Sequence, residues 1–207
     1  MTAIFHPSKI IAVGLNYYDH ARELNMSVPE YPLIFLKPPT AVIYSGESIV
    51  YPPQSSEVHF EGELAVIIKD KIKNISVDKV RNHIAGYTCA NDVTARDIQR
   101  NDGQWTRAKS FDTFCPLGPK IISDIDPSSL NICTRVNGLE RQYSNTKNMI
   151  FDVFELTSYI SGIMTLMPGD VIITGTPPGV GAINPGDTVE VEIEKVGVLM
   201  NKVIQQG

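Results

Sequence analysis

The chain has 207 residues, of which 43% are hydrophobic and 20% are charged, and its formal net charge is −5. This composition is typical of a globular protein with a sizeable core, and the length fits one catalytic domain over residues 1–207. The acidic balance excludes the basic surface of a nucleic-acid-binding protein.

The cysteines and the first residues bear on the cellular compartment. Cys89, Cys115 and Cys133 lie far apart and are odd in number, which argues against a disulfide framework or a zinc site. Residues 1–9 lack the pattern of a secretory leader, and no apolar run reaches the roughly 18 residues of a membrane helix. We therefore expect a cytoplasmic protein with reduced thiols and no membrane partner.

The first elements are a short apolar strand over residues 10–14 and a short helix over 16–24, with Asn16 or Asp19 as its N-cap. Prolines follow the helix, and the segment 16–30 has the features of a lid. His20 and Glu23 lie three residues apart, so they are neighbours on one helical face. The pair is either a general base with its orienting carboxylate or a surface ion pair, and spacing alone does not choose.

The next stretch predicts a strand over residues 32–39, with Lys37 near its end. Residues 41–44 and 48–51 flank a Ser-Gly-Glu turn, and this pattern predicts a β-hairpin.

Two glutamates precede an apolar, β-branched run at residues 59–68, which predicts a strand entering the core. On a strand, Glu61 and Glu63 point to the same face, where a bound cation would relieve their repulsion. The small-residue strand 85–97 ends in acids and hydroxyls, and Asp92 is well placed to complete an all-oxygen triad. The alternative is a strand end with two solvated glutamates.

The remainder of the chain predicts a polar loop at 104–114, a helix at 151–163 and β-strands at 130–137, 171–174 and 189–194. The loop carries Lys109 and is suited either to binding an anionic substrate or to an ordinary interface. Residues 175–181 form a rigid glycine–proline loop without the Gly-Lys-Ser/Thr of a P-loop. Its N–H groups and the Thr176 hydroxyl are suited to holding a carboxylate.

Several of these stretches, in this order, resemble the C-terminal domain family of fumarylacetoacetate hydrolase. The matching segments are residues 13–17, 35–39, 61–66, 91–97, 109–119, 174–181 and 197–201. The resemblance implies a mixed, β-rich α/β roll or sandwich with a few short helices, a homodimer, and Mg²⁺ or Mn²⁺ (with Ca²⁺ as an option) on Glu61, Glu63 and Asp92. The resemblance is greatest to the small acylpyruvate hydrolase and oxaloacetate decarboxylase branch. The His-x-x-Glu dyad of that branch matches His20 and Glu23.

Three carboxylates leave three positions open on an octahedral ion, and a 2-oxo acid can fill two of them. The ion is then a Lewis acid at the 2-keto oxygen, and bond cleavage beyond it leaves an enolate. We expect Lys109 to stabilise that charge and Gln99 to position water or a distal carbonyl. Substrate contacts are expected from Lys37, Gly175 and Thr176.

Hydrolysis of acylpyruvates and decarboxylation of oxaloacetate share this enolate, so a metal-dependent hydrolase or lyase is the first expectation. A 2-hydroxyhepta-2,4-diene-1,7-dioate isomerase of aromatic catabolism is the alternative enzyme. An inactive small-molecule-binding relative is the alternative outside enzymes, and the intact set of acids, dyad and lysine argues against it.

Overall fold

The computed structural model describes residues 6–207. Residues 1–5 lie outside the described residues. They belong to the expected domain over residues 1–207 and to the segment that we expected to lack a secretory leader. The described chain forms a mixed α/β, sheet-rich fold with short helices, which confirms the expected fold class.

The largest sheet has seven strands and carries the candidate site. Its spatial order is β2 (Leu33–Lys37), β1 (Ile10–Gly14), β12 (Val171–Ile173), β6 (Gly62–Ile68), β7 (Ile84–Asn91), β9 (Cys115–Ile122) and β3 (Val42–Tyr44). The β1–β12 and β3–β9 pairs are parallel, and the other neighbours are antiparallel. Every residue of β6 is buried, which explains why this strand is almost continuously apolar in the sequence.

A five-stranded sheet packs against the first. Its order is β11 (Leu139–Asn145), β10 (Asn131–Val136), β14 (Thr188–Ile193), β15 (Gly197–Gln205) and β4 (Ser48–Tyr51). Along β14 the core-facing Val189, Val191 and Ile193 alternate with partly exposed residues, as expected for a sheet buried on one face. A small third sheet joins β13 (Gly181–Ile183), β5 (Val58–Phe60) and β8 (Thr94–Ala95).

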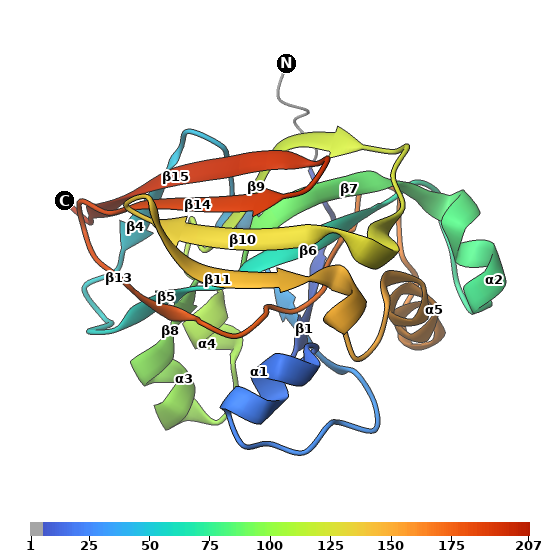
Figure 1. Ribbon diagram of the computed structural model, residues 1–207, viewed down its shortest axis with the longest axis horizontal. Helices are drawn as coiled ribbons and strands as arrows, with labels where there is room; N and C mark the ends of the chain where they lie inside the picture. The colour runs from blue at the N-terminus through green and yellow to red at the C-terminus, as the bar shows by residue number, and fades with distance from the viewer. Residues whose placement is uncertain (1–5) are drawn as a thin grey trace.

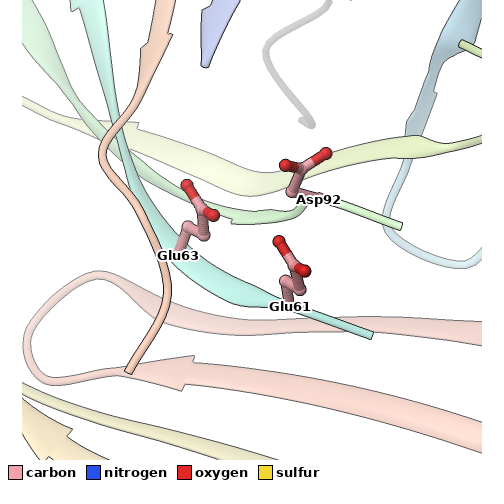
Figure 2. Close-up of side chains that lie close together, drawn as sticks. All are labelled: Glu61, Glu63 and Asp92. Carbon is pink, nitrogen blue, oxygen red and sulfur yellow. The ribbon is translucent and has the colours of Figure 1, made fainter. Parts of the chain in front are cut away.

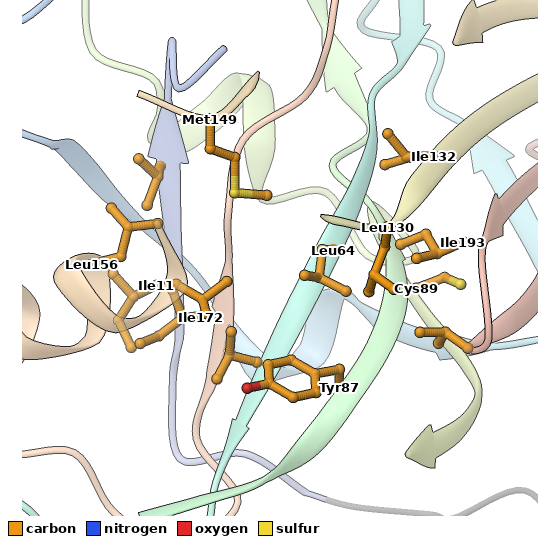
Figure 3. Close-up of a cluster of buried hydrophobic side chains, with 14 of the residues drawn as sticks. Ile11, Leu64, Tyr87, Cys89, Leu130, Ile132, Met149, Leu156, Ile172 and Ile193 are labelled. Carbon is orange, nitrogen blue, oxygen red and sulfur yellow. The ribbon is translucent and has the colours of Figure 1, made fainter. Parts of the chain in front are cut away.

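The main core lies between the two large sheets and continues under a helix (Figure 3). Leu64 of β6 shares this core with Ile132 of β10 and Ile193 of β14, and Leu156 of helix α5 (Val153–Ile163) packs beside Ile11 of β1. A second core lies on the other face of the curled seven-stranded sheet and uses smaller side chains, among them Ala12, Ala65 and Ala90. Glu63 lies two residues before Ala65 and is therefore on this inner side.

The helices gather at two places (Figure 1). Helices α1 (Tyr18–Glu23), α3 (Arg96–Asp102) and α4 (Thr106–Lys109) lie at one end, and α2 (Val77–Val80) lies beside α5. Single 3₁₀ turns occupy η1 (Pro39–Ala41), η2 (Arg81–His83), η3 (Pro127–Ser129) and η4 (Thr146–Asn148). No helix over residues 6–207 has the length and apolar character needed to cross a bilayer.

Helix α5 confirms the predicted helix at 151–163. Its N-cap Asp152 accepts hydrogen bonds from the N–H groups of Phe154 and Glu155, and the Glu155 side chain returns a bond to the Asp152 N–H. Such a capping box satisfies amide groups that the first turn leaves without partners.

The predicted hairpin over 41–51 is wrong. Strand β3 pairs with β9 in the seven-stranded sheet, whereas β4 pairs with β15 in the other sheet. The Asn201 side-chain amide donates to the carbonyls of Tyr44 and Glu47, which fixes the turn against β15. The turn therefore carries the chain from one sheet to the other.

The predicted cap of the first helix is also wrong. The N-cap of α1 is Tyr17, and no side chain caps this helix. Asn16 instead donates to the carbonyls of Phe151 and Thr174 and accepts from the Phe151 N–H. Its amide therefore joins the start of the lid to two distant segments, a use that local sequence does not reveal.

Candidate active site

Three buried carboxylates converge at the inner side of the seven-stranded sheet, where Glu61, Glu63 and Asp92 point toward one another (Figure 2). One ligand oxygen from each lies within 4.8 Å of the other two. Strand β6 pairs with β7 so that Glu63 lies opposite Ala90, and the Asp92 N–H donates to the Glu61 carbonyl at 2.8 Å. Backbone pairing therefore brings together acids that are far apart in the sequence.

The expected continuous strand over 59–68 is broken at Glu61, which lies between β5 and β6. The next residue is glycine because a Cβ there would lie 2.0 Å from Thr134 Oγ1. Its N–H donates to Gln142 Oε1, while the Glu61 N–H donates to Asn91 Oδ1. The side chains of Glu61 and Glu63 nevertheless point to the same place, as their i, i+2 spacing predicts.

Three cations approach the triad within the described part of the chain. Lys109 Nζ donates to Glu61 Oε2 at 2.8 Å and to Asp92 Oδ2 at 2.6 Å, and Lys37 Nζ donates to Asp92 Oδ1 at 2.5 Å. Arg96 Nη2 donates to Glu61 Oε1. Lys109 is almost fully buried in α4, so its predicted place in a polar loop is wrong.

The pKa values of Glu61 and Glu63 are shifted in opposite directions. Burial alone would raise the pKa of Glu61, but Lys109 and Arg96 together lower it to about 2. Burial raises the pKa of Glu63 well above its usual value, and the charges of Asp92 and Glu61 raise it further. The Gly175 N–H donates to Glu63 Oε2 at 2.6 Å and offsets only part of this effect. Among the described contacts, Glu63 is the acid without a cationic hydrogen-bond donor.

The donor set fits a hard divalent cation. All three groups are carboxylates, their oxygens lie close enough to converge on one ion, and no sulfur or imidazole belongs to the cluster found in residues 6–207. Mg²⁺, Mn²⁺ and Ca²⁺ prefer such all-oxygen sites. Repulsion from Asp92 and Glu61 helps to raise the Glu63 pKa, and a bound cation would relieve this repulsion.

The lid brings His20 to the same place. His20 Nδ1 lies 2.8 Å from Glu23 Oε2, and the Glu23 carboxylate accepts a hydrogen bond from the Gly179 N–H at 3.2 Å. The expected dyad geometry is therefore present, and its carboxylate also fastens the lid to the glycine–proline loop. With Nδ1 held by Glu23, Nε2 is the ring nitrogen left for a ligand.

A cavity of about 490 Å³ connects these groups. Of the predicted site residues, seven line its wall: His20, Glu61, Glu63, Asp92, Gln99, Lys109 and Thr176. Glu23, Lys37 and Gly175 lie behind the wall and contact the cavity through His20, Asp92 and Glu63 respectively. The Thr176 hydroxyl already donates to the Gly62 carbonyl and accepts from Gln142 Nε2.

Arg96 is a site residue that the sequence argument passed over, although the residue stands four positions after Asp92. Its Nη1 donates to Gln99 Oε1 at 2.6 Å, and its Nε donates to His59 Nδ1 at 3.4 Å. His59 Nε2 in turn lies 2.8 Å from Glu57 Oε1. His59 therefore holds Arg96 from behind and contributes no atom to the acidic cluster.

Known proteins are similar to this chain over nearly its whole length. A family model described as fumarylacetoacetate (FAA) hydrolase C-terminal matches residues 9–204. The chain is 47% identical over 216 residues to mitochondrial oxaloacetate tautomerase FAHD2A of Bos taurus, covering 99% of this chain and 69% of the relative.

Two solved structures extend the comparison. A 5-carboxymethyl-2-hydroxymuconate delta-isomerase from Mycobacterium smegmatis superposes with a TM-score of 0.94 at 50% identity and covers 99% of this chain and 82% of its own. A fumarylpyruvate hydrolase from Pseudomonas aeruginosa, in complex with Mn²⁺ and pyruvate, gives a TM-score of 0.91 at 34% identity, covering 98% and 91%.

Proposed function

The chain belongs to the fumarylacetoacetate hydrolase C-terminal family, and on this basis we propose that it is a divalent-metal-dependent enzyme that acts on 2-oxo or 2,4-dioxo acids through an enolate. The observation that carries the proposal is that the buried acid triad and His20, which is paired with Glu23, line one cavity.

Glu61, Glu63 and Asp92 would hold the ion, which when bound supplies Lewis acidity at the carbonyl next to the substrate carboxylate. The metal is Mg²⁺ or Mn²⁺ by the chemistry of the donor set, with Ca²⁺ as a weaker candidate. Lys109 lies beside two of the acids and is placed to stabilise negative charge that develops on the substrate oxygen. Lys37 orients Asp92 from behind, and Gly175 orients Glu63.

His20 is the proposed base. Its Nδ1–H is donated to Glu23, so the Nε2 lone pair is free to take a proton from water or from the carbon next to the 2-keto group. Proton removal from water delivers hydroxide to the distal carbonyl of an acylpyruvate, and the electron pair of the broken C–C bond passes into the enolate. Gln99, held by Arg96, is placed to orient the water or the distal carbonyl.

Keto–enol tautomerisation is the second candidate, and the similarity to an oxaloacetate tautomerase over 99% of the chain favours it. In this reaction His20 takes a proton from the carbon next to the 2-keto group, the 2-keto oxygen gains a proton, and no C–C bond breaks. The isomerase among the similar structures fits the same chemistry. A purely binding role is disfavoured because the dyad, the triad and Lys109 are all present and in mutual reach.

Ultraviolet absorbance separates these reactions. The purified protein is mixed with acetylpyruvate, and separately with the enol of oxaloacetate, in the presence of Mg²⁺ or Mn²⁺. Decay of the acylpyruvate band with pyruvate release identifies a hydrolase, accelerated loss of the oxaloacetate enol without CO₂ release identifies a tautomerase, and CO₂ release identifies a decarboxylase. Identical traces with a chelator or without protein would contradict the proposal.

The proposal includes a homodimer in the cytoplasm. Exposed apolar side chains alternate along the outer face of β15 at Val198, Met200 and Ile204, and such a row supports a self-association surface. Light scattering coupled to gel filtration tests the dimer, and a monomer mass at all concentrations would remove that part of the proposal.

A further inference from the structure

The cavity has two chemically different halves. Its floor holds the acid triad with Lys109 and Arg96. The rest of the wall is largely apolar and comes from the lid, β2 and the start of α4. Its side chains are Leu24, Met26, Pro29, Leu33, Phe35 and Trp105.

The Phe35 ring marks the boundary between the two halves. Lys109 Nζ lies 5.2 Å from the centroid of this ring, and the Trp105 ring meets it edge-on with 5.2 Å between centroids. A ligand whose charged head lies at the triad and Lys109 therefore passes Phe35 and reaches Trp105.

The Trp105 wall is held in place by close packing. A Cβ on Gly14 would lie 2.7 Å from Trp105 Cζ3, so the indole lies against the bare backbone at the end of β1. With Phe35 on one side and Gly14 on another, the ring forms a fixed apolar surface. The lid contributes the adaptable part, since Met26 is flexible and polarisable.

The outer half offers no unpaired cation to a second carboxylate, as far as residues 6–207 show. Arg100 reaches the cavity, but its Nη1 lies 3.4 Å from Glu57 Oε1 and its Nη2 donates to Glu57 Oε2. Arg96 is bound to Glu61 and Gln99. The part of a ligand that lies here therefore meets mainly apolar side chains.

Several apolar side chains of this outer half are exposed to solvent. Leu24 is 48% exposed, Met26 55% and Leu33 49%. Their exposure fits a surface that an apolar ligand covers. The cavity volume of about 490 Å³ is that of a pocket for a drug-sized ligand, and a three-carbon keto acid leaves much of it unfilled.

We propose that the outer half is an apolar tail site, so that 2-oxo or 2,4-dioxo acids with an extended alkyl or aromatic tail bind more tightly than acids with a short tail. The proposal rests on the proposed function, because the charged head is taken to lie at the triad. It adds Trp105, Phe35 and Leu33 as residues that determine specificity.

Calorimetry on the full chain with Mn²⁺ tests the tail site without relying on turnover. The probes are pyruvate, 2-oxobutanoate, 2-oxohexanoate and 2-oxooctanoate. We expect the dissociation constant to fall about two- to fourfold per added methylene, the gain from burying a CH₂ group.

Two leucines of β2 provide a matched pair of variants. Leu33 and Leu36 are each 49% exposed, but only Leu33 lines the cavity. Leu33→Ala should weaken 2-oxooctanoate binding roughly three- to tenfold and leave pyruvate binding unchanged, because only the tail loses a contact. Leu36→Ala should change neither.

Each outcome of this titration decides the proposal. Affinity that does not depend on tail length, or equal effects of the two leucine variants on 2-oxooctanoate binding, would overturn the tail site. If pyruvate binds under those results, the proposed function still stands. If no 2-oxo acid binds to the metal-loaded protein, both the tail site and the proposed function are wrong.

Discussion

The floor of the cavity and its lid are held by different kinds of contact. On the floor, Glu63 lies within β6, and Glu61 and Asp92 flank the ends of paired strands, with buried ion pairs around them. The lid helix α1 is six residues long, and residues Arg22 to Val28, which include its last two residues, are exposed. A few hydrogen bonds hold the lid, among them Gly179 N–H to Glu23 and Asn148 to Asp19.

This difference indicates that the floor and the lid have different roles. A rigid floor fixes the positions of charges before the substrate arrives, which electrostatic stabilisation of a reacting group requires. A lid with few contacts opens at a small free-energy cost and closes over the substrate. Substitutions in the floor should therefore affect metal binding and stability, whereas those in the lid should affect turnover and leave metal binding unchanged.

Substitution of a floor carboxylate should have the largest effect. Glu63→Gln removes one of three ligand carboxylates, so Mn²⁺ affinity should fall by more than the 10–100-fold that loss of an outer partner costs, and turnover should become undetectable. Calorimetric titration with Mn²⁺ measures this, with Glu192→Gln on the outer sheet as the control. Mn²⁺ affinity within threefold of wild type would remove Glu63 from the metal site.

The lid histidine should come second. His20→Ala should lower kcat about 10²–10⁴-fold, the typical contribution of a general base, while Mn²⁺ affinity stays near that of the parent protein. Glu23→Gln should lower kcat as well, because the imidazole loses the charge that stabilises its protonated form. The control is Arg22→Gln on the same helix, because the Arg22 side chain is 83% exposed. A kcat of His20→Ala within threefold of wild type would show that His20 is not the catalytic base.

Lys109→Ala should weaken both chemistry and folding. Its ammonium group contacts two buried carboxylates, and desolvation, which lowers the Lys109 pKa, is outweighed by Asp92 and Glu61, which raise it. Leaving the acids unpaired should destabilise the metal-free protein by about 3–5 kcal/mol, and added Mn²⁺ should recover part of that loss. Urea denaturation with and without Mn²⁺ measures both effects. The control is Lys79→Ala, at an exposed lysine. Unchanged unfolding curves would show that Lys109 is dispensable to the floor.

Asp97→Asn should have the smallest effect and tests how α3 is anchored. Burial raises the pKa of Asp97, but hydrogen bonds from Ser55, Ser56 and the Ile98 N–H lower it to about 2. Because the folded pKa lies below the unfolded value of about 3.9, this carboxylate stabilises the fold above pH 3.9, and the effect is lost as pH falls toward 2.

We therefore expect Asp97→Asn to lower the free energy of unfolding by less than about 1 kcal/mol at pH 7, since the group is partly solvated, and by less again at pH 3. Thermal melts at both pH values provide the comparison. A larger loss at pH 3 than at pH 7 would contradict the assigned sign.

Much of the site followed from the sequence because local chemistry determines it. The i, i+3 spacing places His20 and Glu23 on one face of α1, and the apolar run after Glu63 predicts a buried strand. The aspartate and glutamate of residues 152–155 similarly indicate the start of α5. These features depend on neighbours within a few residues.

Tertiary structure alone decided the rest. Local turn chemistry predicted a hairpin at 41–51, but pairing with β9 and β15 sent its strands to different sheets. Lys109 stands in a polar stretch, and only the packing of α4 against the triad buries it. The two halves of the cavity likewise arise where the lid, β2 and α4 meet. Burial, long-range strand pairing and charge compensation depend on which distant segments become neighbours, and the local sequence pattern does not contain that information.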